Sequence, residues 1–308
     1  KGYNDHIGFD VDERLIKKIL IMRYQKVSIT TIQSKNDLDK LVLRKPDLVF
    51  SGVKYFNFKK EKIWLNDFLK QNNISHITSS AKDLQSESNK SIAKDIIRKA
   101  KIITANSLVV YANKMPKSFA LPMPFPVFVK PLIGGNSKGV DEHSVVTNST
   151  ELKKKIKDIQ KKYNCASIVE TYLRGKEYTV GIMQDTVTGN LIALPAEIII
   201  EKNKQGQRIL DFKMKKENTE ELIKVSDIKL FNVLADMAKK SFKALKGRSI
   251  GRIDIRMNEN FIPHFIEANL MPGLRGGYFY RCCNLNLNIN YQEMILRIVN
   301  NGLTLSKI

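Results

Sequence analysis

The spacing of apolar and polar residues in the first part of the chain predicts alternating helices and strands. Residues 10–22 have the periodicity of an amphipathic helix with acidic residues in its first turn. We expect the next elements to be a strand at Val27–Ile32, a helix at Asn36–Leu43, a strand at Pro46–Phe50, a helix at Ile63–Gln71 and a strand at Ile74–Thr78. This alternation predicts parallel βαβ units. Because such sheets normally start with a strand, we infer that an opening strand was lost, processed or left disordered.

Strands become more frequent in the rest of the chain. We expect helices at Ser91–Ala100, from Glu151, at Asp227–Leu245 and from Tyr291. We expect strands at Leu108–Tyr111, Val127–Lys130, Ser144–Thr147, Ala166–Glu170, Glu177–Met183 and Leu191–Glu201, and a hairpin at 250–268. No internal repeat or low-complexity linker is present, so topology alone sets the domain boundaries. We predict an α/β protein with an N-terminal domain at 1–80, a central domain at 81–168 and a C-terminal domain at 169–308.

The formal net charge of +21 raises the alternative of a basic nucleic-acid-binding protein. The surplus is mostly lysine, however, and it is spread along all 308 residues. Clusters such as Lys153-Lys154-Lys155 fall where solvated helix faces are expected. Neither zinc-finger spacing nor interleaved aromatic and basic residues occur. We therefore expect no nucleic-acid partner.

Cysteine content and hydropathy indicate the compartment. The three cysteines form an odd set without a C-x-x-C pair, which favours a reducing environment and hence the cytoplasm. No apolar run reaches the length of a membrane span and no signal peptide is visible, so we expect no membrane partner. The chain opens on Lys1 rather than Met, which leaves its true N-terminus open.

The expected hairpin carries the most informative polar pattern. Side chains along a strand alternate between its faces, so Arg252 and Asp254 share the face opposite the intervening isoleucines. Arg256 continues this row, and on the returning strand the same rule groups Phe265, Glu267 and Asn269. If the apolar rows face the core, the polar rows converge. Carboxylate and amide oxygens suit Mg²⁺, and a guanidinium beside them suits a phosphoryl group.

A solvated sheet face with solubilising carboxylates would give the same alternation. The residues that follow favour a binding site instead. Pro272-Gly273 comes directly after the polar row, and Gly276-Gly277 follows shortly. Backbone of this kind lets a substrate approach closely.

This segment resembles the metal-binding motif of D-alanine–D-alanine ligases, which have the ATP-grasp fold with an N-terminal Rossmann-like domain. The resemblance implies two Mg²⁺ ions, with Mn²⁺ as an alternative, bound by Asp254, Glu267 and Asn269. Glu267 would bridge the ions. Arg252 matches the arginine that stabilises the acyl-phosphate and tetrahedral intermediates, and Gly273 belongs to the same catalytic segment.

Upstream segments resemble the nucleotide site of this family in the same order. The resemblance assigns Lys90, Lys130 and Lys215 to the ATP phosphates, Glu170 and Leu173 to adenine, and Glu177 to the ribose hydroxyls. Lys213 is a near competitor of Lys215. Ser137 belongs to Gly134–Gly139, which resembles the loop that closes over the phosphates with backbone N–H groups. Asn136 stands where the family has a serine of that loop.

The resemblance implies an ATP-dependent ligase that forms an amide bond between amino-acid or peptide substrates. The stretch Leu274–Tyr278 lacks the hydroxyl residues with which D-alanine ligases hold the acceptor carboxylate. We therefore expect a different product, with Arg275 and Tyr278 contacting a larger or more anionic substrate. A catalytically inactive nucleotide-binding protein is the alternative, and a homodimer is compatible with the family. The first 80 residues resemble it only in general outline.

Overall fold

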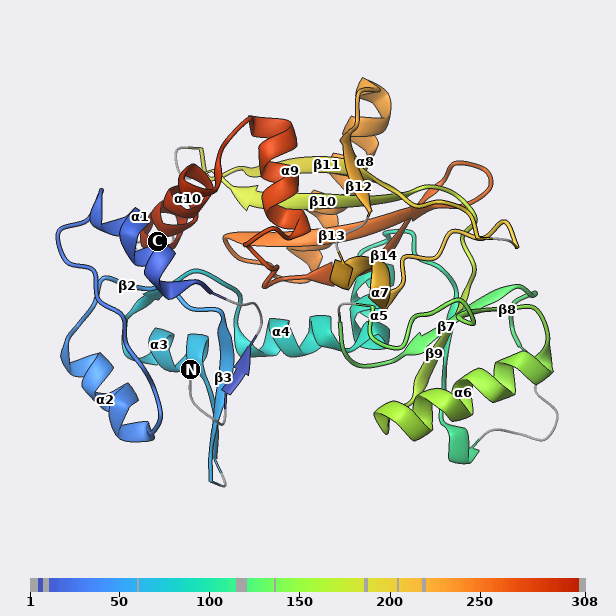
Figure 1. Cartoon of the computed structure of the whole chain (residues 1–308), viewed down its shortest axis with the longest axis horizontal. Helices are drawn as coiled ribbons and strands as arrows, with labels where there is room; N and C mark the ends of the chain where they lie inside the picture. The colour runs from blue at the N-terminus through green and yellow to red at the C-terminus, as the bar shows by residue number, and fades with distance from the viewer. Residues whose placement is uncertain are drawn as a thin grey trace.

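The computed structural model describes residues 5–7, 11–59, 61–114, 121–135, 137–185, 188–203, 205–217 and 220–304. We call residues 5–88 the N-terminal lobe, residues 107–171 the central lobe and residues 177–287 the C-terminal lobe. The N-terminal lobe and the central lobe lie on opposite sides of the molecule, and the C-terminal sheet lies above the central one (Figure 1). Helices α4 and α5 (Lys90–Lys99) connect the two sides.

The N-terminal lobe has small sheets around an apolar core. Its elements are β1 (Asp5–Ile7), α1 (Glu13–Ile21), α2 (Lys35–Leu43), β2 (Leu48–Val49), β3 (Val53–Phe58), β4 (Glu61–Trp64), α3 (Leu65–Gln71), β5 (Ser75–His76) and α4 (Ala81–Ser88). Strands β1, β3 and β4 pair antiparallel, and β2 pairs with β5 in parallel. Leu38 and Leu41 of α2 pack with Phe56 and Leu69, because their spacing places them on one helix face.

Two predictions for this lobe were wrong. The segment predicted as a strand at Val27–Ile32 is irregular, because it has no partner strand and only Ile32 is buried. A strand does precede the first helix, since β1 pairs with β3. It lies antiparallel at a sheet edge and does not open a parallel sheet. Among the described residues the expected parallel arrangement is limited to the β2–β5 pair.

The central lobe is a four-stranded antiparallel sheet covered by one helix. Its elements are β6 (Ser107–Val110), the short 3-10 helix η1 (Ala112–Lys114), β7 (Val127–Pro131), β8 (Val145–Val146), α6 (Ser149–Tyr163) and β9 (Ser167–Thr171), with strand order β6-β9-β7-β8. The side chain of Asn148 caps α6 by accepting hydrogen bonds from the backbone N–H groups of Thr150 and Glu151. Leu152, Ile156 and Ile159 bury one face of α6 against the sheet.

The C-terminal lobe is a five-stranded antiparallel sheet with helices on both faces. Its elements are β10 (Glu177–Gln184), β11 (Leu191–Ile199), α7 (Phe212–Glu217), β12 (Glu221–Lys224), α8 (Ile228–Ala244), β13 (Ile250–Met257), β14 (Pro263–Asn269) and α9 (Tyr278–Leu287), with strand order β12-β11-β10-β13-β14. Helices α4, α7 and α9 were not predicted. In α9, Gly276-Gly277 before the helix and several asparagines within and after it obscure its apolar face.

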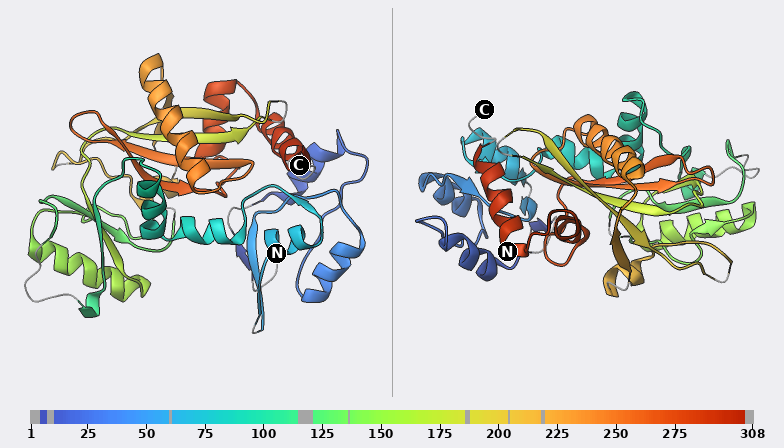
Figure 2. Two further views of the ribbon diagram at one scale, coloured as in Figure 1. Left: turned by 180° about the vertical axis from the view of Figure 1, so that it is seen from behind. Right: turned by 90° about the horizontal axis from the view of Figure 1, so that it is seen from above.

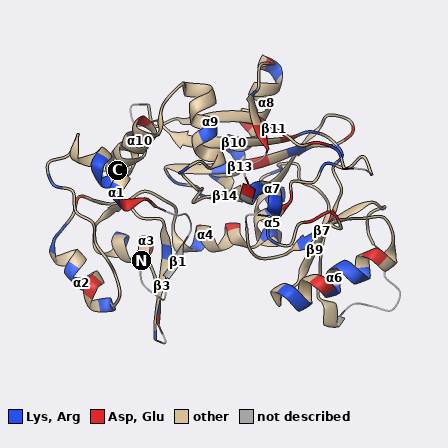
Figure 3. Cartoon of the chain, viewed as in Figure 1, with Lys and Arg blue, Asp and Glu red and all other residues tan. Residues whose placement is uncertain are grey.

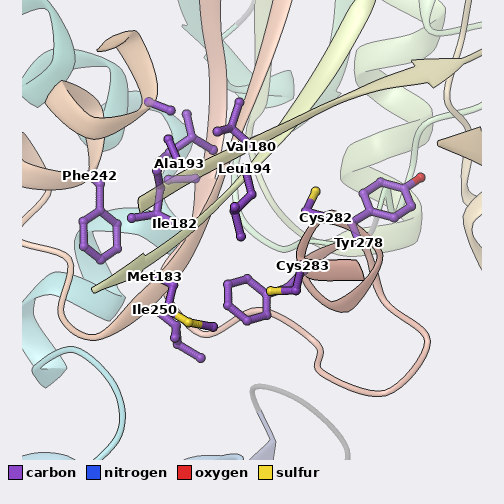
Figure 4. Packing of buried hydrophobic residues seen from close by; sticks show 14 of the residues in the cluster. Val180, Ile182, Met183, Ala193, Leu194, Phe242, Ile250, Tyr278, Cys282 and Cys283 are labelled. Carbon is purple, nitrogen blue, oxygen red and sulfur yellow. The ribbon is translucent and has the colours of Figure 1, made fainter. Parts of the chain in front are cut away.

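Two glycines let α8 and α9 approach this sheet closely. A Cβ on Gly251 would meet the ring of Phe242 in α8 at 2.5 Å, and one on Gly181 would meet the Cβ of Cys282 in α9 at 3.1 Å. Gly181 pairs with Arg252, the neighbour of Gly251, so the two glycines face opposite sides of the sheet. Figure 4 shows Phe242 on one side of the strands and Cys282, Cys283 and Tyr278 on the other.

Helix α10 (Tyr291–Thr304) returns the chain to the N-terminal lobe. It packs against α1, β2 and β5. A Cβ on Gly302 would lie 2.4 Å from Leu48, so glycine permits this approach. The view from above shows α10 beside the first helices (Figure 2). Across the described residues, no helix is both long and apolar enough to cross a membrane.

Lysine and arginine lie on helices and strands of all three lobes (Figure 3). Helix α6 carries many of them on the face that does not contact the sheet. Within the cluster expected on a solvated face, Lys154 is exposed and Lys153 is half-buried. The expectation was wrong for Lys155, which is buried and forms an ion pair with Asp141 at 2.6 Å.

Candidate active site

A cavity of about 790 Å³, open to solvent, lies between the central sheet and the C-terminal sheet. Its walls come from β7, β9 and the Gly134–Gly139 loop on one side, and from β13, β14 and α7 on the other. The predicted residues that line it are Lys90, Lys130, Ser137, Glu170, Leu173, Glu177, Lys215, Asp254 and Glu267. The fold thus brings together residues that are up to 177 positions apart in the sequence.

A buried charge cluster forms the back of the cavity. Glu170 on β9 makes ion pairs with Lys130 on β7 and with Lys94 on α5, each at 2.9 Å. Burial by itself would raise the pKa of Glu170, but the two ammonium groups outweigh it and hold the pKa at about 2. Lys94 also donates a hydrogen bond to Thr104 Oγ1 at 2.8 Å. Both carboxylate oxygens of Glu170 therefore face lysines.

Lys90 contacts the Gly-rich loop in another part of the lining. Lys90 Nζ donates a hydrogen bond to the carbonyl of Gly134 at 2.6 Å, and burial lowers the pKa of its ammonium. Ser137 has a φ of 53° and donates its hydroxyl to the carbonyl of Leu210 at 3.0 Å. This bond joins the loop to the segment before α7. Asn136 lies outside the described residues.

Leu173 and Glu177 line the cavity near the connection from β9 to β10. Glu177 Oε2 accepts a hydrogen bond from Arg256 Nη1 at 3.1 Å, and Arg256 also donates to the carbonyl of Arg208 at 2.7 Å. Burial raises the pKa of Glu177 despite this guanidinium. The guanidinium of Arg256 also lies 5.3 Å from the ring centroid of Tyr172.

The polar rows of the β13–β14 hairpin converge as predicted. Asp254 lies directly opposite Glu267, and Arg252 lies opposite Asn269. One expectation for the hairpin was wrong. A β-bulge follows Asp254, so Phe265 pairs with Ile255 and is fully buried in the core instead of joining the polar row.

The two carboxylates of this hairpin differ in their partners. Asp254 accepts hydrogen bonds from Arg252 Nε at 3.0 Å, from Arg252 Nη2 at 2.8 Å and from Thr179 Oγ1 at 2.8 Å. Within the described part of the chain, Glu267 makes no hydrogen bond or ion pair. Burial would raise its pKa, but Lys215, Lys130, Lys90 and Arg252 hold the pKa at about 2. Glu267 is thus an ionised carboxylate with open acceptor positions.

Lys215 and Tyr278 meet beside the hairpin. Lys215 on α7 is half-buried and lies 5.6 Å from the ring centroid of Tyr278, whereas Lys213 is exposed. This geometry favours Lys215 over Lys213 as the lysine that would contact the phosphates. Arg252 lies 5.1 Å from the same ring. Burial raises the pKa of the Tyr278 hydroxyl, and the nearby carboxylate of Glu220 adds to this effect.

Five predicted residues lie outside the cavity lining, namely Arg252, Asn269, Gly273, Arg275 and Tyr278. Arg275 is exposed and forms an ion pair with Asp12, the N-cap of α1, at 2.9 Å. Gly273 follows the end of β14, and a Cβ there would meet no atom within 4 Å. Asn269 Oδ1 accepts a hydrogen bond from the Met271 backbone at 3.0 Å.

The prediction from sequence missed four charged or polar partners in and around the site. They are Lys94, Thr179, Glu220 and Arg256. Arg256 had a local signal, because it continues the polar row of Arg252 and Asp254. Lys94 and Glu220 had none, since their burial depends on residues far away in the sequence.

The chain is similar in sequence to known proteins over the region that contains this site. Residues 97–300 match the family model described as D-ala D-ala ligase C-terminus. The chain is 25% identical over 217 residues to a D-alanine–D-alanine ligase of Clostridium botulinum (strain Eklund 17B / Type B), covering 70% of this chain and 67% of that protein. It is 27% identical over 188 residues to the one of Clostridium perfringens (strain SM101 / Type A), covering 59% and 56%.

Solved structures of D-alanine–D-alanine ligases and a related ligase have a fold similar to that of this chain. The D-alanine–D-alanine ligase of Bacillus anthracis complexed with ATP has a TM-score of 0.68 at 20% identity, covering 97% of this chain and 96% of that one. The VanG D-Ala:D-Ser ligase of Enterococcus faecalis has a TM-score of 0.61 at 16% identity, covering 78% and 68%. The chain has the ATP-grasp fold of these enzymes. It belongs to the D-alanine–D-alanine ligase family, through the C-terminal region that defines that family.

Proposed function

We propose that the protein is an ATP- and Mg²⁺-dependent carboxylate–amine ligase that forms an amide bond through an acyl phosphate. The observation that carries this proposal is Glu267, an ionised carboxylate that has no hydrogen-bond or ion-pair partner among the described residues and lines a lysine-rich cavity. Asp254 lies opposite it on the neighbouring strand. Such a site suits a cation that is itself bound to phosphates.

The cavity suits ATP, with the phosphates at the hairpin end. Lys90, Lys130 and Lys215 would neutralise the phosphates, and the Gly134–Gly139 loop would cover them with backbone N–H groups. Leu173 would contact adenine, and Glu177 the ribose. Since Glu170 already contacts two lysines, its proposed part at the adenine is mainly to fix Lys130. A related ligase of known structure was crystallised with ATP.

The residues at the hairpin fit Mg²⁺, with Mn²⁺ as an alternative. The donor set of Asp254, Glu267 and Asn269 offers oxygen ligands, and the Glu267 carboxylate has no partner in the described part of the chain. Mg²⁺ typically takes one or two carboxylates and completes its coordination with water and phosphate oxygens. When bound, the metal would neutralise charge on the phosphates.

The proposed reaction has two balanced steps. A substrate carboxylate oxygen attacks the γ-phosphorus, the bond to the β–γ bridging oxygen breaks, and ADP leaves. An amine nitrogen then attacks the acyl carbon, phosphate leaves, and the nitrogen loses a proton. Arg252, fixed by Asp254, would stabilise the oxyanion of the second step, with Ser137 and Gly273 shaping the site. The protein needs no covalent nucleophile because positioning and charge supply catalysis.

We further propose that the product differs from D-alanyl-D-alanine. No serine or threonine occurs in Leu274–Tyr278, and the bulky ring of Tyr278 lies against Arg252 at the expected acceptor side. This stretch therefore offers no serine or threonine hydroxyl to a small acceptor, and the ring of Tyr278 changes the shape of this side. Arg275 would contribute only after leaving Asp12.

A phosphate-release assay tests the proposal. The wild-type protein is supplied with ATP, Mg²⁺ and a panel of D- and L-amino acids and dipeptides, and products are identified by mass spectrometry. We expect release that depends on both a carboxylate and an amine substrate and stops with EDTA. ATP turnover without any amide product across the panel would contradict the proposal, and efficient D-alanine dimerisation would contradict the proposed substrate difference.

A further inference from the structure

Glu87 is a largely buried carboxylate close to the candidate metal site that the proposed reaction does not use. It lies in the last turn of α4, in the N-terminal lobe, and its side chain is 9% exposed. Helix α4 packs against β14, the strand that ends at Asn269. The electrostatic neighbours of Glu87 include both Glu267 and Arg252.

Glu87 holds the chain directly after the candidate metal ligands. Its Oε2 accepts a hydrogen bond at 3.0 Å from the backbone N–H of Leu270, which follows Asn269. The next N–H, of Met271, is bound by Asn269 itself. Leu270 and Met271 are fully buried, so the contact with Glu87 fixes where the backbone leaves β14 and how Asn269 is presented.

The charge of Glu87 is only loosely compensated. Lys54 on β3 is the cation beside it, with Nζ 3.9 Å from Glu87 Oε1, beyond hydrogen-bonding distance. The Lys54 side chain is 13% exposed, so little solvent screens the pair. Burial raises the pKa of Glu87, and the Glu267 carboxylate adds to this effect. In its ionised form Glu87 adds negative potential beside Glu267, which would attract a divalent cation, whereas the ammonium of Lys54 opposes it.

We propose that Glu87 is a positioning residue for the metal ions bound at Glu267 and Asn269, acting through the Leu270 backbone and through its charge. This inference rests on the proposed function. It makes metal binding depend on the N-terminal lobe, because α4 and Lys54 both belong to that lobe. Residues outside the ligand shell commonly change metal affinity by about 10- to 100-fold.

The alternative is that Lys54 and Glu87, both in the N-terminal lobe, only support the contact of α4 with β14. The two roles predict different effects of substitutions at Glu87 and Lys54 on metal affinity. If Glu87 positions the metal, Glu87→Ala weakens metal binding and Lys54→Met leaves it unchanged or tightens it. If the pair only supports this contact, both substitutions break it and move metal binding in the same direction.

Mn²⁺ titration monitored by electron paramagnetic resonance tests this in full-length protein saturated with the non-hydrolysable analogue AMP-PNP. We expect Glu87→Ala to weaken Mn²⁺ binding by about 10-fold. Glu87→Gln, which keeps an acceptor for the Leu270 N–H, should lose less. AMP-PNP affinity without metal should stay within about two-fold of wild type for both. Glu61→Gln, in the exposed Lys35–Glu61 pair of the same lobe, is the matched control.

The outcomes separate the two proposals. If wild-type protein with AMP-PNP binds no Mn²⁺, the proposed function fails and this inference with it. If wild type binds Mn²⁺ and folded Glu87→Ala binds it within two-fold of wild type, only this inference is overturned. A loss of equal size in Lys54→Met also overturns it. Should Glu87→Ala fail to fold, Glu87→Gln and Lys54→Met decide by the sign of their effects.

Discussion

The two walls of the cavity differ in how the negative charges of their carboxylates are compensated. On the central wall, Glu170 is compensated by Lys94 and Lys130 before any ligand is present. On the C-terminal wall, Asp254 is paired with Arg252, but Glu267 has no partner among the described residues. Both Glu170 and Glu267 have a pKa of about 2, in one case from direct ion pairs and in the other from the field of more distant cations.

This contrast indicates that the Glu170 cluster stabilises the fold, whereas Glu267 is available to bind a ligand. Removing one partner of a buried ion pair leaves an uncompensated charge, so the central wall should be sensitive in stability. Glu267 has open acceptor positions, so changing it should affect a ligand more than the fold.

Glu267→Gln should lower ATP-dependent phosphate release by about 1,000-fold or more, because metal binding at this carboxylate is worth several kcal/mol in the transition state. The melting temperature should also fall, because the surrounding cations lower the pKa of Glu267 to about 2 and the ionised carboxylate therefore stabilises the fold, so turnover is compared at a temperature where both proteins are folded. Steady-state kinetics and thermal unfolding measure the two quantities. Glu259→Gln in the exposed turn of the same hairpin is the control. Near-normal turnover in Glu267→Gln would remove the basis of the metal assignment.

Lys94→Met should lower the free energy of unfolding by about 3 kcal/mol, because Glu170 keeps only one of its two ammonium partners in a buried site. Urea unfolding at neutral pH measures it. Lys240→Met, which breaks the exposed pair with Asp236, should change it by less than about 1 kcal/mol. Equal effects of the two substitutions would show that the central cluster is no more important than a surface pair.

Lowering the pH should change the contributions of Glu170 and Glu177 to the free energy of unfolding in opposite directions. The pKa of Glu170 is lowered to about 2, so its contribution is complete above the unfolded value near 4.5 and is lost as the pH falls through about 2. It amounts to about 3 kcal/mol. The pKa of Glu177 is raised, so wild type loses stability relative to Glu177→Gln as the pH rises above about 4.5.

Urea unfolding of wild type, Glu170→Gln and Glu177→Gln between pH 3 and 7 measures both slopes. The advantage of wild type over Glu170→Gln should shrink as the pH falls. The stability of Glu177→Gln relative to wild type should grow as the pH rises. Parallel slopes for the two variants would mean that the walls do not differ electrostatically.

Arg275→Ala should have the smallest effect. Its ion pair with Asp12 is largely exposed, so the free energy of unfolding should change by less than about 1 kcal/mol. ATP affinity, measured by calorimetry, should not change because Arg275 lies outside the cavity lining. A large loss of ATP affinity would place this arginine at the nucleotide and contradict the arrangement described above.

The hairpin was predictable from sequence because its alternation is local and strict. Arg252, Asp254 and Glu267 fall on one face by counting residues, and the structure pairs them accordingly. The bulge after Asp254 was not predictable, since Phe265 and Ile266 are both apolar and either could face the core. Lys94 follows Lys90 by one helical turn and looks like a second exposed lysine until Glu170 is brought beside it.

The N-terminal lobe was less predictable for a physical reason. Val27–Ile32 has the β-branched residues of a strand, but strand formation depends on a neighbouring strand that the fold does not supply. Helix α1 and helix α2 were predicted to within about three residues at each end because their apolar faces are local features. The roles of the individual site residues stay predictions, since they concern ligands and not folding.

The packing of α5 places the cavity at the junction of two apolar cores. Ala93 and Ile97 of α5 belong to the same apolar core as the C-terminal sheet, whereas the central sheet has a core of its own. The first residue of α5 is also joined to the central lobe, because Lys90 donates its backbone N–H to the carbonyl of Leu132 at 3.3 Å and its Nζ to the carbonyl of Gly134 at 2.6 Å. One turn later, the ion pair between Lys94 and Glu170 connects α5 to β9. Helix α5 therefore links both walls of the cavity.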